Sequence, residues 1–480
     1  MVVKPEWKQV FYVLGLQFNM MSKGTAMAFP ATLIPALQEP DSGIKIDLGL
    51  TSWLVSISGL SGLAPVIMLG PIMHYGGRKV ANLCVTVPIL IGWILTHFAG
   101  NYNSVGMLLA GRFLQGLPLG AGYFMSVCIG EFSSPKMRNI LLSVKMIAGV
   151  VGVALMHLMA YFLHWKNLAL LGAVPPTLAL IVTLFWPETP EWLVSRGRYT
   201  EAETVFYSLR GFSAEGEREL KQLIETEKAR RRENANNTIM HDLLRKLKSP
   251  VLWRPVLVLF FTMLIPVMGG RHFIASYSVH LAEQLSGDKS KGYFYTVIGN
   301  AISLPASFIN VYFVKLFTRR RLMLGFGLAG VVLLVAVCLM LYIRTKYSHE
   351  VLSWLILITI AVYYFLANVA FYPVSYILMG EIFPLEYRAI GSVLDGILGS
   401  LGMAAVVAVM PWLEIGIGTH GMLLVFASIM FFSLMYLYVE LPETKNRTLH
   451  DVGDYFRGKS PKIRRADDVS SVEENRFISK

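Results

Sequence analysis

The chain has 480 residues, of which 54% are hydrophobic and 15% are charged, and its mean hydropathy is +0.54. Soluble domains carry about 45–50% apolar and about 25% charged residues, so the composition excludes a soluble globular protein and predicts one embedded mostly in lipid. The net charge of +12 fits basic loops at a bilayer surface with anionic lipid. No basic soluble domain is present to bind nucleic acid.

Apolar stretches of about 20 residues follow one another along the chain, and this is the length that an α-helix needs to cross a hydrocarbon core of about 30 Å. Six of them precede a long polar insert and six follow it. They begin near residues 10, 50, 80, 105, 140 and 167, and then near 255, 292, 321, 354, 389 and 418. The sequence therefore predicts an all-α membrane protein with 12 transmembrane helices.

Alternate connections between these stretches are rich in lysine and arginine, the residues that set membrane orientation in short loops. The basic set includes Arg78, Arg138, the insert from about 190 to 252, Arg319–Arg321 and the tail after 441. The opposite connections are acidic or nearly uncharged. This pattern predicts an integral, multi-pass membrane protein with both termini in the cytosol.

A repeated motif shows that the chain is duplicated. GEFSSPKMR at 130–138 and GEIFPLEYR at 380–388 lie 250 residues apart, and each places an arginine seven residues after a glutamate at the junction of two apolar stretches. Glu131 and Arg138 are therefore equivalent to Glu381 and Arg388. We expect two pseudo-symmetric six-helix halves.

The polarity of the chain divides it into four parts. Residues 1–189 form the N-terminal six-helix half, and residues 253–442 form the C-terminal half. The segment 190–252 alternates apolar and charged residues at helical spacing, which predicts a cytosolic helical linker. The polar tail, 443–480, has the composition of a disordered cytosolic segment.

Further motifs carry a family resemblance: GGRK at 76–79, GRFLQGLPLGAG at 111–122, PETPEW at 187–192, RRRL at 319–322 and PETKNRT at 442–448. With the repeated Glu and Arg pairs, they resemble the sugar porters of the major facilitator superfamily, closest to insect facilitated trehalose and hexose transporters. The resemblance implies the major facilitator fold, alternating-access transport and facilitative uniport of a sugar. It also implies a monomer in the plasma membrane, with a small-molecule substrate and no enzyme activity.

Charges at the cytosolic helix ends are candidates for gating. A carboxylate and a guanidinium at a membrane interface can form an ion pair that is broken and remade, and such pairs would bias two conformations of a carrier. The alternative is that they are anchors that only set topology. His74, Tyr75, Leu316 and Arg319 depart from the family pattern and predict a looser latch. The gating candidates are Arg78, Arg112, Glu131, Arg138, Glu188, Arg320, Glu381, Arg388 and Glu443.

The sugar site departs from the family pattern. Sugar porters hold hydroxyls with amide side chains and stack an aromatic ring on the sugar, but most of these positions are replaced here. The replacements are Met146, Pro266, Val267, His272, Leu304, Tyr376 and Gly399. Other polar side chains inside the apolar stretches become the substrate-path candidates, because embedded polar groups usually face a cavity or a partner. These are Gln17, Asn19, Lys23, His272, Tyr277, Asn300, Tyr376 and Asp395.

Several alternatives stay open. The first apolar stretch contains no aspartate or glutamate, which favours facilitated diffusion, but Asp395, His157 and His272 keep proton-coupled symport possible. A non-sugar solute or a non-transporting sugar sensor also fits the altered site. No GxxxxGK[ST] loop is present for an ATP-driven pump, and the three cysteines lie in apolar stretches, so we expect no disulfide, metal or cofactor. Lys145 and Asp395, at equivalent places in the two halves, could join one electrostatic network.

Overall fold

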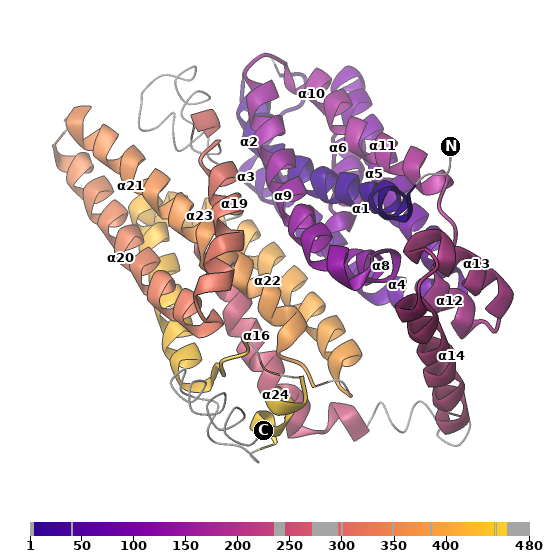
Figure 1. The fold of residues 1–480 in the computed structure, drawn as a ribbon. Coiled ribbons are helices and arrows are strands. Elements are labelled where there is room, and N and C mark those ends of the chain that lie inside the picture. Colours follow the sequence, from indigo (N-terminus) through magenta and orange to yellow (C-terminus); the bar gives the residue numbers. More distant parts are fainter. Residues whose placement is uncertain are drawn as a thin grey trace. The chain divides into compact units, whose positions relative to one another are not determined.

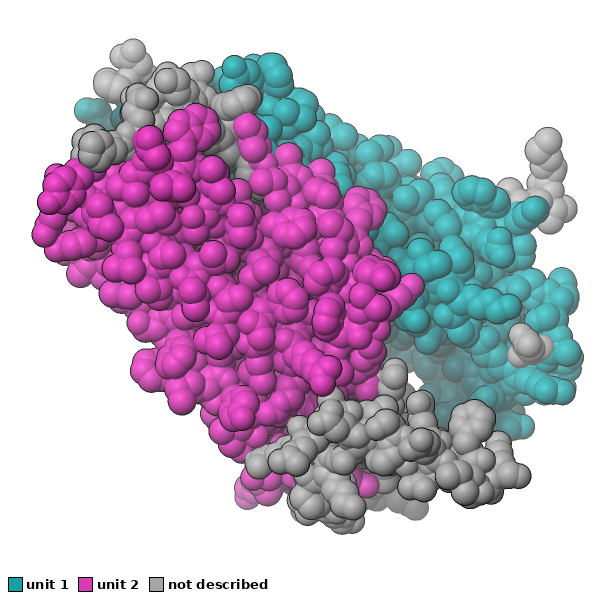
Figure 2. Space-filling model, turned by 60° about the vertical axis from the view of Figure 1, so that its left-hand side comes forward, with its two compact units in different colours: residues 1–244, 275–283, 289–297 teal, residues 245–274, 284–288, 298–480 magenta. Residues whose placement is uncertain are grey.

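The computed structural model describes residues 4–39, 42–234, 245–270, 296–298, 301–347, 350–384, 386–445, 447 and 449–457. Within these ranges all regular elements are helices, and there is no strand. The chain forms two compact units, which Figure 1 traces along the sequence and Figure 2 shows in different colours. Unit 1 comprises residues 1–244, 275–283 and 289–297, and unit 2 comprises residues 245–274, 284–288 and 298–480.

Unit 1 is a bundle of membrane helices with three further helices at one end. Several of its spans are broken where glycine or proline interrupts them: Pro30 begins α2 directly after α1, and Gly62 separates α3 from α4. Its elements are α1 (Pro5–Ala28), α2 (Pro30–Leu37), α3 (Leu48–Ser61), α4 (Leu63–Tyr75), α5 (Gly77–Tyr102), α6 (Val105–Gln115), α7 (Leu117–Gly120), α8 (Gly122–Phe132), α9 (Pro135–Ala160), α10 (Trp165–Gly172), α11 (Val174–Leu184), α12 (Pro190–Ser195), α13 (Tyr199–Arg210) and α14 (Ala214–Asn234).

Close backbone contacts hold the bundle of unit 1 together. A Cβ atom on Gly24 of α1 would lie 2.1 Å from the carbonyl oxygen of Gly149 in α9, and one on Gly120 would lie 1.8 Å from the carbonyl oxygen of Gly62. Any side chain at these two positions would collide with backbone. Small residues of this kind let membrane helices pack at short distance, which explains the glycines of the GRFLQGLPLGAG motif at this contact.

Unit 2 is a second helical bundle. Its first helix ends at Gly269, whose carbonyl oxygen accepts hydrogen bonds from the hydroxyls of Tyr363 (2.5 Å) and Tyr372 (2.8 Å). The two tyrosines satisfy a helix-end carbonyl that has no partner within the helix. The elements are α16 (Pro250–Met268), α19 (Ser303–Leu316), α20 (Arg319–Lys346), α21 (Glu350–Val369), α22 (Phe371–Glu381), α23 (Arg388–Glu440) and α24 (Leu449–Phe456).

The membrane spans agree with the predicted all-α membrane fold. Among the described residues, 9 helical segments are long and apolar enough to cross a bilayer, and the bent pair Val105–Gly120 and Gly122–Phe132 brings the number to 10. Two features explain why fewer segments are found than the 12 predicted transmembrane helices. The helix α23 contains two arms on either side of Gly418 (φ 71°, ψ 167°), and α1 with α2 is less apolar because it carries Gln17, Asn19 and Lys23.

The insert after the sixth predicted span packs as part of unit 1. The helices α12, α13 and α14 contact one another, and α13 also packs on α1. Gln9 of α1 donates its amide to the carbonyl oxygen of Leu209 at 2.6 Å and accepts the backbone N–H of Ser134 at 2.8 Å. Unit 2 begins at residue 245, within the predicted linker of residues 190–252.

Candidate functional site

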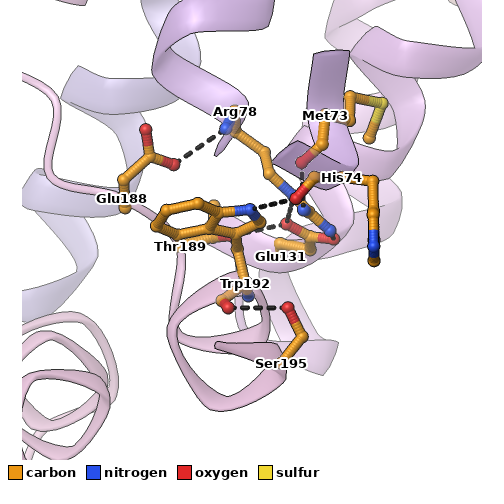
Figure 3. Close-up of polar contacts among 8 residues, drawn as sticks. All are labelled: Met73, His74, Arg78, Glu131, Glu188, Thr189, Trp192 and Ser195. Atoms are coloured by element: carbon orange, nitrogen blue, oxygen red, sulfur yellow. Dashed lines mark hydrogen bonds and ion pairs between the residues drawn. The ribbon is translucent and has the colours of Figure 1, made fainter. Parts of the chain in front are cut away.

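Charged side chains at one end of unit 1 form a compact network, the N-half cluster, made of Arg78, Glu131, Glu188 and Thr189. The guanidinium of Arg78 binds Glu131 through both carboxylate oxygens, Nε to Oε2 and Nη2 to Oε1, each at 2.7 Å. Its Nη1 also donates to the carbonyl oxygen of Met73 at 3.1 Å. Figure 3 shows this arrangement. A bidentate pair with little solvent access is among the stronger polar contacts.

Glu188 of the N-half cluster binds the backbone at the start of α5. Its carboxylate accepts the backbone N–H of Arg78 at 2.8 Å and that of Lys79 at 3.2 Å, at the start of α5. An acidic group at a helix N-terminus satisfies free N–H groups and the helix dipole. Burial raises the pKa of Glu188, and the two N–H donors oppose that rise. Gly77 has φ +89°, and a Cβ there would lie 2.5 Å from the Glu188 carboxylate, so the GGRK motif needs glycine at 77.

The linker helix α12 is attached to the same cluster. The hydroxyl of Thr189 donates to Oε2 of Glu131 at 2.7 Å and also caps α12 by accepting the N–H of Trp192. The indole N–H of Trp192 donates to the carbonyl oxygen of His74 at 3.0 Å. The PETPEW motif therefore joins the end of α11 to the start of α5 and to α8.

The side chain of Glu191 in α12 is a third carboxylate, close to Glu131 and Arg78 of the N-half cluster. Its Oε2 is buried and accepts no hydrogen bond among the described residues. Burial and the neighbouring charge of Glu131 raise the pKa of Glu191 to about 8, while Arg210 and Arg78 act in the opposite direction. Burial and the charge of Glu131 therefore favour the protonated form of Glu191.

Unit 2 repeats the N-half cluster with Arg319, Glu381, Glu443 and Thr444, which we name the C-half cluster. Nη2 of Arg319 binds Oε1 of Glu381 at 3.2 Å, and the Thr444 hydroxyl donates to Oε2 of the same carboxylate at 2.6 Å. Glu443 accepts the backbone N–H groups of Arg319 (3.0 Å) and Arg320 (3.1 Å) at the start of α20. Each contact has a counterpart in unit 1.

The equivalence of the two clusters shows which arginine of unit 2 binds the central glutamate, Glu381. Arg319, which we had counted as a departure from the family pattern, occupies the place of Arg78. Arg320 corresponds to Lys79, and its side chain donates to the carbonyl oxygens of Leu441 and Tyr438 at the end of α23. A run of three arginines gives no sequence signal for which one reaches the carboxylate, because each is one residue from the next.

Three of the other predicted gating residues lie apart from these ion pairs. Arg138 donates Nη2 to the carbonyl oxygen of Gly130 at 3.0 Å, so the carboxylate of Glu131 is held by Arg78 and not by Arg138. Arg388 begins α23 and is half-buried. Arg112 is buried in α6, where it donates to the carbonyl oxygens of Leu54 and Ala26.

Two substrate-path candidates of the first span are held within the packing of unit 1. The amide of Asn19 is fully buried and donates to Oδ1 of Asn82 (2.9 Å) and to the hydroxyl of Thr86 (2.8 Å), so both of its N–H groups serve helix packing. Gln17 donates to the carbonyl oxygen of Leu141 at 2.9 Å, and its buried Oε1 has no hydrogen bond to any residue that the structure describes.

The other candidates separate into those that the structure describes and those that it does not. Lys23 and Tyr376 are half-buried and each has an interaction partner. Asp395 lies in α23 with 3% of its surface exposed. His272, Tyr277 and Asn300 lie outside the described residues. The described candidates thus belong to two separate units, and no single binding site follows from their positions.

Two functional side chains were missed in the sequence, Thr189 and Thr444. Both bind the central glutamate of their cluster. A signal was present, because PETPEW and PETKNRT share the triplet Pro-Glu-Thr after equivalent spans. The shared threonine could have been assigned from that repeat.

The fold and the two clusters define a membrane protein built from a duplicated helical half, with a charge network at equivalent helix ends. A family model described as "Sugar (and other) transporter" matches residues 16–456, and the chain belongs to this family. Its members are transporters and not enzymes. The predicted family and the integral multi-pass membrane class are confirmed.

Comparisons with individual proteins agree with this assignment. Trehalose transporter 1 of Drosophila melanogaster is 28% identical over 471 residues, which is 97% of this chain and 53% of the relative. Facilitated trehalose transporter Tret1 of Culex quinquefasciatus is 27% identical over 479 residues, 98% of this chain and 90% of the relative. The chain thus spans about half the length of the Drosophila relatives it matches.

Solved structures confirm the predicted major facilitator fold. The xylose transporter XylE from E. coli, in a partially occluded inward-open conformation, aligns with a TM-score of 0.74 and 17% sequence identity. The alignment covers 92% of this chain and 100% of the transporter. A second structure, the proton:xylose symporter XylE bound to 6-bromo-6-deoxy-D-glucose, aligns with a TM-score of 0.75 and 17% identity over 94% of this chain and 100% of the symporter.

Proposed function

We propose that this chain is an alternating-access carrier that moves a sugar, trehalose or a hexose, across the membrane by facilitated diffusion. The observation that carries the proposal is the pair of matched clusters, Arg78 with Glu131 and Arg319 with Glu381. A carrier of two pseudo-symmetric halves needs contacts at equivalent helix ends that stabilise one of its conformations. The choice of sugar rests on the names of the trehalose-transporting relatives.

In this proposal the two clusters act as the gating elements of their halves. Glu131 and Glu381 hold the ends of the spans, and Glu188 and Glu443 fix the N-termini of α5 and α20. The linker of residues 190–252 lies in the cytosol and connects, along the chain, the halves 1–189 and 253–442. The protein works as a monomer in the plasma membrane, with both termini and the tail of residues 443–480 in the cytosol.

The surroundings of Arg112 support uniport over proton coupling. This buried guanidinium donates to two carbonyl oxygens and to Oε1 of Gln115 at 2.8 Å, all of them uncharged acceptors. None of these groups exchanges a proton near neutral pH. Buried Asp395 favours the second candidate, proton-coupled symport, since an embedded carboxylate can carry a proton between the two sides.

The test is counterflow of labelled trehalose and glucose into proteoliposomes of the purified full chain, with the same pH inside and outside. We expect uptake without a pH gradient, and a large loss of uptake for Glu131→Gln but not for Glu203→Gln in α13, which is exposed. Uptake that requires an inward proton gradient would favour symport. Folded protein that binds sugar without uptake would indicate a sensor.

A further inference from the structure

One face of α23 in unit 2 carries polar side chains inside an apolar membrane segment. The apolar segment of this helix runs from Ile390 to Glu440, and Ser392 and Asp395 lie near its beginning, in the arm before Gly418 (Figure 1). Both side chains are buried, with 7% and 3% of their surfaces exposed. Since residues three apart are neighbours on one side of a helix, these two residues form a polar patch, which we name the α23 polar pair.

The α23 polar pair has no partner among the residues that the structure describes. With those residues the carboxyl group of Asp395 forms neither a hydrogen bond nor an ion pair, and the hydroxyl of Ser392 forms no hydrogen bond. A helical serine often donates to the carbonyl oxygen four residues earlier, as Ser433 does to Ile429 in the second arm of α23. An embedded carboxyl group without a partner is costly and usually faces a substrate, an ion or a cavity.

Open space lies beside the same face of α23. Gly399 and Gly402 follow Asp395 by four and seven residues, which is the spacing of one helical face. A Cβ atom at either glycine would meet no neighbouring atom within 4 Å. Both glycines are half-buried, so the protein partly encloses this space, which we name the glycine notch.

The depth of the glycine notch fits the position of a transported substrate. Gly399 lies nine residues beyond Ile390, where the apolar segment begins, and at about 1.5 Å per residue this is about 14 Å into a hydrocarbon core of about 30 Å. The notch is therefore close to the bilayer midplane, where carriers built from repeated halves hold their substrates. Asp395 lies about one helical turn nearer to the start of α23.

The α23 polar pair is complementary to the hydroxyl groups of a sugar. The two carboxyl oxygens of Asp395 can bond two neighbouring hydroxyls, and the hydroxyl of Ser392 can donate to or accept from a third. Hydrogen bonds to an ionised carboxylate are about twice as strong as those between neutral groups. Because the glycines project no side chain, a sugar ring can lie against α23 within reach of this pair.

We propose that the α23 polar pair binds hydroxyls of the transported sugar and that the sugar ring lies in the glycine notch. Asp395 is then a residue that determines specificity, and Ser392 supports it. The inference rests on the proposed carrier function and identifies one part of its binding site. It assigns Asp395 to the substrate, whereas the symport candidate assigns it to a proton.

The experiment measures initial uptake of trehalose and glucose by proteoliposomes of the full chain, at equal pH on both sides, and then uses analogues of the faster sugar that each lack one hydroxyl. We expect one analogue to have a KM about tenfold higher than its parent sugar in wild type, because it loses a hydrogen bond to a charged group. Asp395→Ala should raise the KM of the parent sugar by a similar factor and should erase the penalty of that analogue. A structural role alone would not change the ranking of the analogues.

Three further variants separate binding from folding. Ser392→Ala should raise the KM about threefold, since it removes a hydrogen bond between neutral groups. Gly399→Leu fills the glycine notch and should abolish uptake, although its side chain meets open space. The matched control is Gly325→Leu in α20, an exposed glycine with equally open surroundings, which should behave as wild type. The sugar should raise the melting temperature of the wild type and of the control but not of Gly399→Leu.

The outcomes distinguish this inference from the proposed function. Equal rankings of the analogues in wild type and Asp395→Ala would overturn the inference and leave the carrier in place. If Asp395→Asn loses accumulation driven by a proton gradient but keeps counterflow, Asp395 carries a proton and the symport candidate replaces this assignment. Glucosamine uptake that exceeds glucose uptake only while Asp395 is present would assign the carboxylate to an ammonium group instead. If the wild type carries no sugar, the proposed function fails and this inference fails with it.

Discussion

At the scale of single residues, Gly77 shows how a motif follows from geometry. Its φ of +89° is in the left-handed region, and a Cβ would lie 2.5 Å from the carboxylate of Glu188. We expect Gly77→Ala to destabilise the protein by roughly 1–3 kcal/mol, because it adds backbone strain and displaces the cap of α5. Thermal unfolding in detergent measures this. The control is Gly106→Ala, where a Cβ meets nothing within 4 Å, and equal losses in both variants would contradict the explanation.

The two central ion pairs should differ in strength. Arg78 with Glu131 is bidentate, and the exposures of the two side chains are 15% and 12%; for Arg319 with Glu381 they are 13% and 31%, with a distance of 3.2 Å. Double-mutant cycles with glutamine should give a coupling of about 1–3 kcal/mol for the first pair and below about 1 kcal/mol for the second. The exposed pair Arg198 with Glu201 is the control and should show the weakest coupling. A stronger coupling in unit 2 than in unit 1 would refute this ranking.

In the sequence, the repeated motif placed Glu131 and Glu381 at equivalent positions, and the family resemblance named Glu188 and Glu443 as gating candidates. Neither signal gives the partners of these glutamates, because sequence spacing does not give side-chain direction. Arg78, 53 residues away from Glu131, holds it, whereas Arg138, seven residues away, does not. The amide of Asn19 was expected on the substrate path, but it serves packing against α5.

At the scale of elements, the short helix α12 should respond to pH. The pKa of Glu191 is raised from 4.5 to about 8 by burial and by Glu131, so the folded state holds a proton that the unfolded state releases near pH 4.5. Stability from this group therefore decreases as pH rises from about 4.5 to about 8 and is constant above that. Glu191→Gln should remove the decrease, so the variant gains stability relative to wild type as pH rises.

Melting temperatures between pH 5 and pH 9 test this dependence. The matched control is Glu203→Gln on α13, whose side chain is exposed, and its curve should run parallel to that of wild type. The residue of the C-terminal repeat that corresponds to Glu191 is the amide Asn446, so no similar titration is expected from that position. If the curves of Glu191→Gln and wild type also run parallel, Glu191 does not titrate in this range.

The membrane-spanning elements were easier to predict from the sequence than the partners of the site residues. Apolar length was sufficient to predict a helical membrane protein, because lipid leaves helices and closed barrels as the only solutions, and 9 or 10 of the 12 predicted spans are found among the described residues. The breaks within spans were harder, since α3 and α4 separate at Gly62 inside a continuous apolar run. The first span was predicted despite its polar residues. Those residues also weaken its apolar signal, and the side-chain N–H groups of Gln17 and Asn19 bond to neighbouring helices.

At the scale of the whole molecule, the proposed orientation of the chain in the membrane can be measured. If the N-half cluster and the linker face the cytosol, the loop after α5 faces the opposite side of the membrane. Tyr102 at the end of α5 is 71% exposed, and Phe212 between α13 and α14 is 88% exposed, so both can accept a cysteine. The native cysteines Cys84, Cys128 and Cys338 are first replaced by serine.

Intact cells that express Tyr102→Cys or Phe212→Cys are treated with a membrane-impermeant maleimide. We expect Tyr102→Cys to be labelled at once and Phe212→Cys only after the membrane is permeabilised, because loops rich in lysine and arginine remain in the cytosol. A permeant maleimide, which should label both variants, controls for reactivity. The reverse pattern would invert the proposed topology and place both charge clusters on the outer face, where they would control access from outside the cell.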